Sequence, residues 1–188
     1  MMREPLRRAL LAHRPQDATE AGAVREVLDA LERPADPFDR RTLPGHVTGS
    51  AIVLSPEADA VMLVWHRKLG RWLQPGGHVH AEDGSVLATA ERETREETGL
   101  AELRAPWGAT IVHVDAHAIP PLGAEPGHVH YDIRYLLTAS RSAAVTANTR
   151  EVRAASWFDL DALDTLEVDE SMRRALHAAR RLAAELPH

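Results

Sequence analysis

The chain has 188 residues, a length that suits one domain with additions and is sufficient to bury a hydrophobic core. Its formal net charge of −6 at pH 7 argues against nonspecific binding to nucleic acid or to an anionic membrane. The absence of cysteine excludes a disulfide framework, a zinc–thiolate site and a thiol nucleophile.

Residues 1–34 predict two helices, because apolar side chains recur there at helical spacing. Pro15 separates the two helices, and Asp17 or Thr19 can cap the second one. We interpret residues 1–44 as a helical extension and linker that packs either on the core or on a partner subunit. The two apolar stripes consist of Leu6, Leu10 and Leu11, and of Val24, Val27, Leu28 and Leu31.

Residues 1–14 contain an apolar run that is too short and too interrupted for a signal peptide. No segment approaches the length of a membrane span, so we expect a cytoplasmic protein without a membrane partner. Lys68 is the only lysine among abundant arginine and alanine, which indicates a GC-rich bacterial genome.

Residues 45–160 carry the pattern of a mixed α and β core. Ser85 is a suitable N-cap for a helix over 86–98, and Gly99 is the residue type at which helices commonly end. A turn at 55–59 joins the first two strands. The predicted strands cover 46–54, 60–66, 111–119, 129–137 and 154–158.

The C-terminal part of the chain is predicted to be helical. Residues 159–166 favour a short helix, and 171–186 favour a longer one with arginines on one face and apolar side chains on the other. We interpret residues 161–188 as a segment packed on the core. The apolar side chains at helical spacing are Met172, Leu176, Ala179, Leu182 and Leu186.

Three glutamates stand close together on the helix predicted over 86–98. Glu93, Glu96 and Glu97 have the spacing i, i+3 and i+4, which places them on one helix face. Three carboxylates this close repel one another unless a cation lies among them. Such oxygen ligands suit Mg²⁺ or Mn²⁺, which usually serve phosphate chemistry. Taken alone, the cluster is more typical of a solvated acidic helix face than of a metal site.

The residues before this helix favour the metal site over the plain surface. Residues 67–71 are predicted to turn toward Pro75, Gly76 and Gly77. A Pro-Gly-Gly turn allows the backbone to approach a ligand closely and to direct a carbonyl or an amide at it.

Together, these features resemble the Nudix box, the signature of the Nudix hydrolases. The box reads Gly, five residues, Glu, seven residues, then Arg-Glu-apolar-x-Glu-Glu-x-Gly-apolar. Asp83 stands where the box has its first Glu, eight residues rather than seven separate it from Arg92, and Thr94 occupies an apolar position. The residues that match are Gly77, Arg92, Glu93, Glu96, Glu97, Gly99 and Leu100.

The resemblance implies the α+β class and the Nudix fold, an α/β/α sandwich around a mixed β-sheet, over residues 45–160. It implies a divalent-metal-dependent hydrolase that cleaves a phosphoanhydride in a nucleoside diphosphate linked to another moiety. Nucleotide sugars, ADP-ribose, dinucleotides, nucleotide coenzymes and (d)NTPs all remain open as substrates. The alternative is a nonhydrolytic nucleotide-binding sensor, against which the intact glutamates argue. An isomerase of the isoprenoid type would need a catalytic cysteine that this chain lacks.

By the same resemblance, Glu93 and Glu97 are the foremost metal ligands, Glu96 is the next, and the Gly76 carbonyl is a further one. Mg²⁺ or Mn²⁺ is the implied cofactor. Arg92 is expected to hold the cluster in place through a charge-assisted bond to Glu96 or to Asp83.

A catalytic carboxylate from a later loop is also implied. Glu151 precedes a predicted strand at a position that resembles the later catalytic glutamate of some Nudix enzymes, and we prefer it as the base. Glu125 lies in a loop rich in proline and glycine and is the other candidate.

On two predicted strands, histidine, aspartate and arginine side chains occupy every second position. Alternate residues of a strand share one face, so these side chains lie together. If the strands pair, a polar face results, with three possible roles: a solvated or internally satisfied network, a substrate pocket, or a Zn²⁺ or Ni²⁺ site. The spacing lacks a zinc motif, which makes the metal the least favoured of the three. One strand carries His128, His130, Asp132 and Arg134, and the other carries His113, Asp115 and His117.

Candidate substrate contacts lie on both sides of the glutamate helix. His78 and His80 adjoin the Gly-Gly turn, and Arg67 belongs to a basic cluster that could meet phosphates. With His128, His130 and Asp132 they form our predicted substrate-binding set. The predicted partner is a small nucleotide rather than a nucleic acid, and the additional helices make a homodimer plausible.

Overall fold

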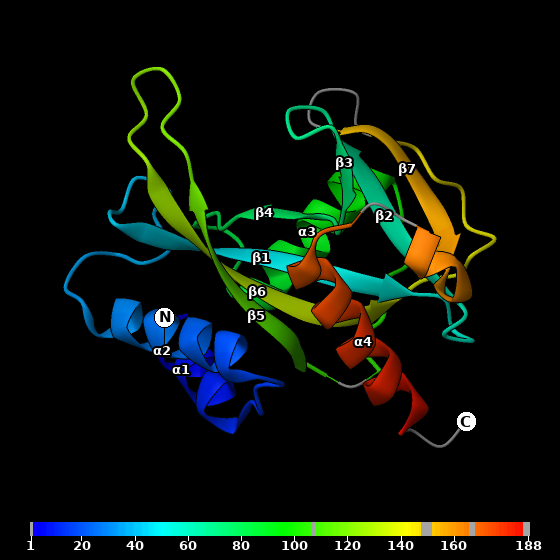
Figure 1. Ribbon diagram of the computed structural model, residues 1–188, viewed down its shortest axis with the longest axis horizontal. Coiled ribbons are helices and arrows are strands. Elements are labelled where there is room, and N and C mark those ends of the chain that lie inside the picture. Colours follow the sequence, from blue (N-terminus) through cyan, green and yellow to red (C-terminus); the bar gives the residue numbers. More distant parts are fainter. Residues whose placement is uncertain (1, 107, 148–151, 166–167, 186–188) are drawn as a thin grey trace.

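The computed structural model describes residues 2–106, 108–147, 152–165 and 168–185 (Figure 1). Its α-helices are α1 (Arg3–Ala12), α2 (Ala18–Glu32), α3 (Val86–Thr98) and α4 (Glu170–Ala184), with a short 3₁₀ helix, η1 (Leu160–Thr165). Its strands are β1 (Gly45–Leu54), β2 (Ala60–His66), β3 (Arg71–Leu73), β4 (Gly76–His78), β5 (Ile111–Ile119), β6 (His128–Thr138) and β7 (Val152–Asp159).

The seven strands of the described residues form one mixed sheet with β1 at its centre. β1 runs parallel to β6 along its whole length, and β6 pairs in antiparallel fashion with β5. The other edge of β1 pairs in antiparallel fashion with two strands. β4 pairs with the middle of β1, and β2 pairs with the end of β1. This sheet with helices on both sides is the predicted α+β sandwich.

The two faces of β1 belong to two hydrophobic cores, because successive side chains of a strand point to opposite faces. Val47, Ala51 and Val53 face the core that includes residues of α1, α2 and α3. Ile52 and Leu54 face a second core, formed largely with α4. Figure 1 shows α3 and α4 on opposite sides of the sheet. Side chains at even-numbered positions near the start of β1 therefore lie on the face opposite α3.

The N-terminal helices pack on the core rather than standing apart from it. Leu6 and Leu10 of α1, with Val27 and Leu31 of α2, are buried in the same cluster as Val47. The N-terminal segment therefore contributes to the larger of the two cores.

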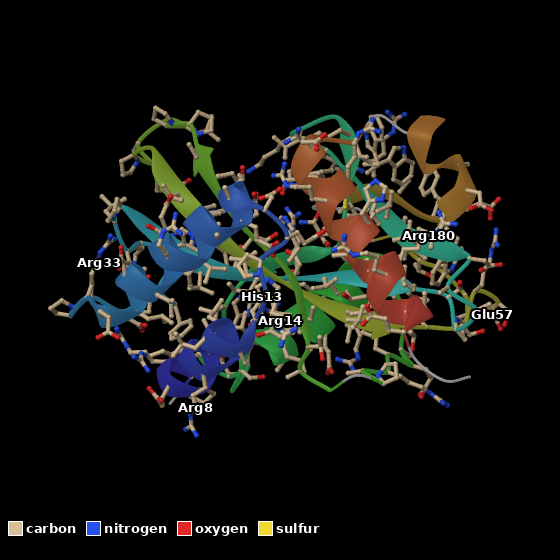
Figure 2. The ribbon with its side chains drawn as sticks, turned by 60° about the horizontal axis from the view of Figure 1, so that its bottom comes forward. Arg8, His13, Arg14, Arg33, Glu57 and Arg180 are labelled. Carbon is tan, nitrogen blue, oxygen red and sulfur yellow. The ribbon has the colours of Figure 1, made fainter. Side chains whose placement is uncertain are left out.

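A buried carboxylate joins the start of α2 to the edge strand β5. Glu20 accepts a hydrogen bond from the backbone amide of Val114 at 3.0 Å and one from the amide of Gln16 at 2.7 Å. Its Oε1 also lies 2.8 Å from Nε2 of His13, which is labelled in Figure 2. Burial alone would raise the pKa of Glu20, but these hydrogen bonds outweigh it and the pKa is lowered. The cap predicted at Asp17 is present as well, since its side chain accepts from the Glu20 amide.

Within the described residues the predicted elements are confirmed, with two additions, and the short helix after β7 is a 3₁₀ helix. Leu166 and Leu186, at the ends of the two predicted C-terminal helices, lie outside the described residues. β3 and β4 were not predicted, because each is only three residues long and β4 begins with two glycines, a residue type depleted in strands. Both form through pairing with longer neighbours, β3 with β2 and β4 with β1. No helix in the described part of the chain combines the length and the apolar character that a membrane crossing requires.

Candidate active site

Helix α3 begins and ends at the residues that its sequence predicts. The Ser85 side chain accepts a hydrogen bond from the Ala88 amide at 3.1 Å, which caps the first turn. Gly99 takes the left-handed conformation, with φ of 74°, and ends the helix. These two ends fix the register in which Glu93 and Glu97 face β4.

Glu93 and Glu97 are almost fully enclosed between α3 and β4, at 6% and 4% exposure. The Gly76 amide donates to Glu97 Oε2 at 3.1 Å. A Cβ atom on Gly77 would lie only 2.5 Å from Glu93 Oε1, so the second glycine leaves the space that this carboxylate uses. The side chain of Glu96 is 49% exposed, which turns the third carboxylate of the cluster toward solvent.

Arg92 ties the helix to the loop before it. Its Nε and Nη2 donate to the two oxygens of Asp83 at 2.8 and 3.0 Å, a bidentate pair. Nη2 also donates to the His78 carbonyl at 2.9 Å. Nη1 donates to Glu93 at 2.9 Å and reaches Glu96 at 3.4 Å. Both partners predicted for Arg92, Asp83 and Glu96, are therefore present in one network.

Asp83, which stands where the box pattern has glutamate, holds the loop before α3 by hydrogen bonds. Beyond Arg92, it accepts from the His80 amide and from the Thr89 hydroxyl, both at 2.8 Å. Burial would raise the pKa of Asp83, but the hydrogen bonds from Arg92, His80 and Thr89 lower it to about 2. Gly84, at φ of 70°, turns the chain directly after it and absorbs the additional residue.

This arrangement fits a hard divalent cation. The donors that meet here are carboxylate oxygens, from Glu93, Glu97 and Glu96, beside the backbone of Gly76. Mg²⁺ and Mn²⁺ prefer such oxygen ligands. The glycine opposite Glu93 also leaves a space that any larger residue would fill.

On the opposite face of the sheet, Asp132 is the centre of a closed polar network. Its carboxylate accepts from Thr48 at 3.1 Å, from Ser50 at 2.6 Å, from Gln74 at 3.1 Å and from Arg134 at 2.9 Å. Asp132 is buried, so these four donors replace its solvation. The structure thus places this predicted substrate contact inside the protein and fully hydrogen-bonded.

Histidines gather on the same face, closer to the start of β1. Parallel pairing sets His46 opposite His130, and antiparallel pairing sets His78 opposite Thr48. The ring centroids of His46 lie 5.2 Å from His78 and 4.8 Å from His130. His128 stacks on His46 at 5.0 Å. β5 and β6 do pair, the condition on which the polar face depended, and this brings His117 to 5.6 Å from His130.

His46 was absent from our predicted site residues. Nothing in the sequence near His46 indicates that it meets His130, because the contact depends on the parallel pairing of two strands far apart in the chain. The alternation of His46, Thr48 and Ser50 was the available signal, since it marks a polar face on a strand that is otherwise apolar.

The other predicted contacts that the structure describes have exposed side chains. His80 is exposed in the loop before α3. Arg67 is exposed at the turn after β2, where its Nε donates to the Val152 carbonyl at 3.3 Å. Glu125 is exposed in the loop between β5 and β6. Glu151, our preferred base, lies outside the described residues.

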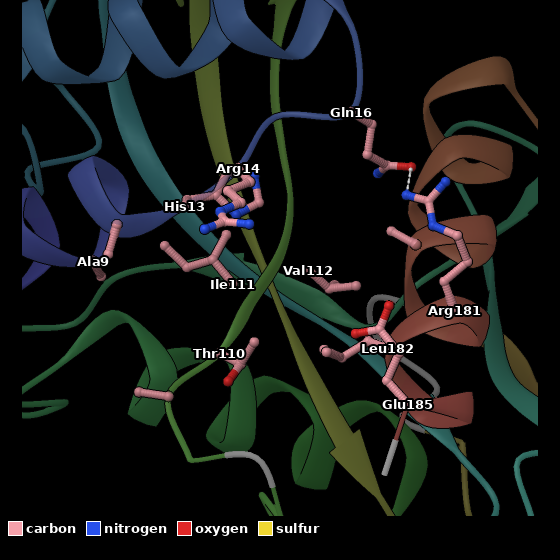
Figure 3. A pocket seen from close by; sticks show the side chains of 13 residues that line it. Ala9, His13, Arg14, Gln16, Thr110, Ile111, Val112, Arg181, Leu182 and Glu185 are labelled. Atoms are coloured by element: carbon pink, nitrogen blue, oxygen red, sulfur yellow. Dashed lines mark hydrogen bonds between the residues drawn. The ribbon is translucent and has the colours of Figure 1, made fainter.

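Two cavities border the fold. One, of about 520 Å³, lies between the end of α1, β5 and α4, and none of Glu93, Glu96 and Glu97 lines it. Figure 3 shows it with Arg181 hydrogen-bonded to Gln16 at 3.0 Å across one side. Another, of about 430 Å³, is bordered by Phe38, Arg40 and His80. The second is the one beside the loop that leads into α3.

Comparisons with known proteins agree with this geometry. The profile described as "NUDIX domain" matches residues 45–179. A search of curated proteins finds no significant match. A Caenorhabditis elegans Ap4A hydrolase in a binary complex has a TM-score of 0.58 at 14% identity, over 74% of this chain and 98% of its own.

Two further solved structures share the fold. A MutT NUDIX hydrolase from Burkholderia pseudomallei has a TM-score of 0.52 at 25% identity, over 70% of this chain and 95% of its own. The NUDIX domain of Shewanella oneidensis NrtR, complexed with ADP ribose, has a TM-score of 0.51 at 18% identity, over 72% and 86%. The profile match covers well over half of the chain and contains the whole glutamate network. The protein therefore belongs to the Nudix family and is a Nudix-type pyrophosphohydrolase.

Proposed function

We propose that this protein hydrolyses a phosphoanhydride in a nucleoside diphosphate linked to another moiety, with Mg²⁺ or Mn²⁺ as its cofactor. The observation that carries the proposal is the pair of enclosed carboxylates, Glu93 and Glu97, against the backbone of Gly76 and Gly77. Enclosed like charges are costly unless a cation compensates them. A polyphosphate substrate is itself anionic and needs the same compensation.

Each residue of the site would have a distinct role. Glu93 and Glu97, with Glu96 and the Gly76 carbonyl, would hold the ion. When bound, a divalent ion neutralises phosphate oxygens and lowers the pKa of a coordinated water. Arg92 contacts Glu93 and Glu96 and is anchored on Asp83, so it fixes the positions of these carboxylates.

The residue that removes a proton from the attacking water stays a prediction. Glu151 is preferred because it precedes β7, the strand that pairs with β2. Glu125 is the alternative. A carboxylate at either position can act as the base only where it comes close to the attacking water.

The substrate class is proposed from the relatives and from the polar face. The solved relatives include a hydrolase of Ap4A and a domain in complex with ADP ribose. The predicted contacts to the substrate stay Arg67, His78, His80, His128, His130 and Asp132. A cytoplasmic location, a homodimeric state and the lack of a nucleic-acid partner also stay predictions.

Turnover of a substrate panel tests the function. The protein would be incubated with Mg²⁺, and separately with Mn²⁺, and with each of five substrate classes: nucleotide sugars, ADP-ribose, dinucleoside polyphosphates, nucleotide coenzymes and (d)NTPs. Phosphate release would be measured in a coupled assay. Wild type should hydrolyse at least one class, and Glu97→Gln should lose roughly a hundredfold or more of that turnover. Glu91→Gln is the matched control, because Glu91 lies on the same helix but pairs with Arg95.

Two results would contradict the proposal. The first is equal turnover in wild type and Glu97→Gln. The second is no turnover on any member with either metal, combined with a ligand-induced rise in melting temperature, which would identify a nonhydrolytic nucleotide-binding module.

A further inference from the structure

Four histidines from three strands converge on the face of the sheet opposite α3. His46 comes from β1, His78 from β4, and His128 and His130 from β6. One ring nitrogen of each of His46, His78 and His130 lies within 4.8 Å of the corresponding atoms of the other two. Zn–N bonds of about 2.0–2.1 Å imply nitrogen separations of about 3.3 Å around a tetrahedral ion. The ring nitrogens would therefore need to approach one another by up to about 1.5 Å.

His46 is the strongest sign that the cluster is made for a ligand. Its side chain is 1% exposed, yet neither ring nitrogen has a hydrogen-bond partner among the residues that the structure describes. The backbone of Thr42 lies close enough to favour the protonated ring, but without hydrogen-bond geometry. A buried polar group without a partner costs roughly 1–3 kcal/mol, so its retention calls for an explanation.

Burial disfavours the charged form of His46, His78 and His130 and so lowers the pKa of each ring. A neutral imidazole is the form that binds a metal ion.

His128 is oriented as a metal-binding histidine usually is. Its Nδ1 lies 3.0 Å from the Pro126 carbonyl, which can only accept, so Nδ1 carries the proton. In the neutral ring, Nε2 then has the electron pair and accepts a hydrogen bond from Nε2 of His130 at 3.2 Å, a bond that metal binding would replace. A backbone carbonyl on the outer nitrogen is the common way in which proteins fix a histidine ligand.

We propose that His46, His78 and His130, with His128 as a fourth donor, bind one transition-metal ion of the Zn²⁺ class. Imidazole nitrogens suit Zn²⁺, Ni²⁺ and Cu²⁺, whereas Mg²⁺ prefers oxygen. The site is separate from the carboxylate site, because the His78 side chain lies on the face opposite Gly77 and Glu93. The two sites meet through the backbone, since the His78 carbonyl accepts from Arg92.

Metal binding by the 188-residue protein tests this assignment. The protein would be purified without a polyhistidine tag and stripped of metal with a chelator. ZnCl₂ would be titrated against a chromophoric chelator in excess Mg²⁺, so that the carboxylates are already occupied. Wild type should bind one Zn²⁺ per chain. His46→Gln and His78→Gln should each weaken that binding by about tenfold to a hundredfold or more. Loss of a group that only hydrogen-bonds to a metal ligand already costs about that much.

Two controls separate this site from the rest of the protein. Glu97→Gln should retain the Zn²⁺ binding while it loses turnover, so failure of the proposed hydrolase would not affect the result. His177→Gln, which alters an exposed histidine on α4, should also bind like wild type. Bound Co²⁺ gives a second readout, because its visible absorption is far stronger in a nitrogen-ligated site of low coordination number than in an octahedral oxygen site.

The proposal fails if wild type shows no saturable binding of one Zn²⁺ per chain. It also fails if the histidine variants bind as tightly as wild type, or if Glu97→Gln alone abolishes binding. Thermal unfolding of each variant identifies any that does not fold. His78→Gln serves as the second variant in that case, because His78 is only half-buried. A histidine cluster used only for substrate would leave Zn²⁺ binding weak and unaffected by these substitutions.

Discussion

Gly77 is the residue that decides whether Glu93 can occupy its place. In Gly77→Ala the new Cβ atom would meet both carboxylate oxygens of Glu93, at 2.5 and 2.9 Å, so the carboxylate must move. A displacement of about 1 Å in a catalytic group can cost roughly a hundredfold in rate, and we expect a loss of turnover of that order. Steady-state kinetics at saturating Mg²⁺ would measure it.

Gly22→Ala is the matched control for that substitution. A Cβ atom at Gly22 meets only the end of the Arg25 side chain, at 3.9 Å, and alanine favours the helix. Turnover should stay unchanged and stability should rise by about 0.5–1 kcal/mol. Full activity in Gly77→Ala would show that the Glu93 position is not needed for catalysis.

Asp83 is the residue whose loss should loosen the loop before α3. Asp83→Asn keeps the shape but removes the charge that Arg92 and the His80 amide contact, so we expect the free energy of unfolding to fall by about 1–3 kcal/mol. Turnover should fall as well, because Arg92 also contacts Glu93. Chemical denaturation and kinetics of the same samples would measure both effects.

The pH dependence of this contribution follows from the lowered pKa of Asp83. A carboxyl whose pKa is about 2 in the folded protein and near 3.8 otherwise stabilises the fold fully above pH 3.8. The contribution disappears as the pH falls from 3.8 through about 2. Asp161→Asn is the control, because Asp161 is exposed and forms only a surface pair with Arg180. Equal acid stability of Asp83→Asn and wild type would contradict the assignment.

At the scale of residues, the sequence was informative where spacing within one element decides contacts. Glu93 and Glu97 share a face because they are four residues apart on one helix. The contact of Glu93 with Gly77, the three donors to Asp132 from outside its own strand and the meeting of His46 with His130 all join different elements. Such contacts depend on strand pairing and on the packing of α3 against β4, which spacing along the chain does not reveal.

At the scale of elements, Glu20 is the link between α2 and the edge strand β5. Glu20→Gln replaces a carboxylate that accepts hydrogen bonds from the backbone amides of Val114 and Gln16. The NH₂ group of the new glutamine is itself a donor and cannot accept from these amides. We expect the free energy of unfolding to fall by about 1–3 kcal/mol. Hydrogen exchange should show faster opening of the Val114 amide than in wild type.

The exposed Glu26 of the same helix provides the control, since Glu26→Gln should leave both quantities unchanged. The pKa of Glu20 is lowered in the folded protein, so its carboxylate stabilises the fold above the ordinary value of 4.5. That stabilisation is lost as the pH falls below this value. Unchanged protection of Val114 in Glu20→Gln would contradict the proposed link.

Long elements were predictable and short ones were not, for a physical reason. α2, α3 and β1 each contain enough residues for an apolar period and carry their own caps or turns. β3 and β4 have only three residues each, and their hydrogen bonds come from the partner strand rather than from any preference of Gly76 or Gly77.

At the scale of the whole molecule, the family profile begins at residue 45, but the hydrophobic core does not. Leu6, Leu10, Val27 and Leu31 are buried with Val47 of β1 in one cluster. Full burial of each such side chain stabilises a fold by about 1.5–3 kcal/mol, so the four together contribute on the order of 10 kcal/mol. That sum is comparable to the total stability of a typical domain. We therefore expect the N-terminal helices to unfold together with the sheet.

Leu10 and Leu11 test this cooperativity, because they are neighbours of the same type with opposite surroundings. Leu10 is 1% exposed and Leu11 is 59% exposed. Leu10→Ala should lower the free energy of unfolding by about 2–5 kcal/mol, whereas Leu11→Ala should change it by less than about 0.5 kcal/mol. Urea unfolding followed by tryptophan fluorescence and by circular dichroism should give one coincident transition in both variants. If α1 and α2 were an independent appendage, Leu10→Ala would instead produce an early helix-only transition and leave the fluorescence midpoint, which reports on the sheet, where it is in wild type.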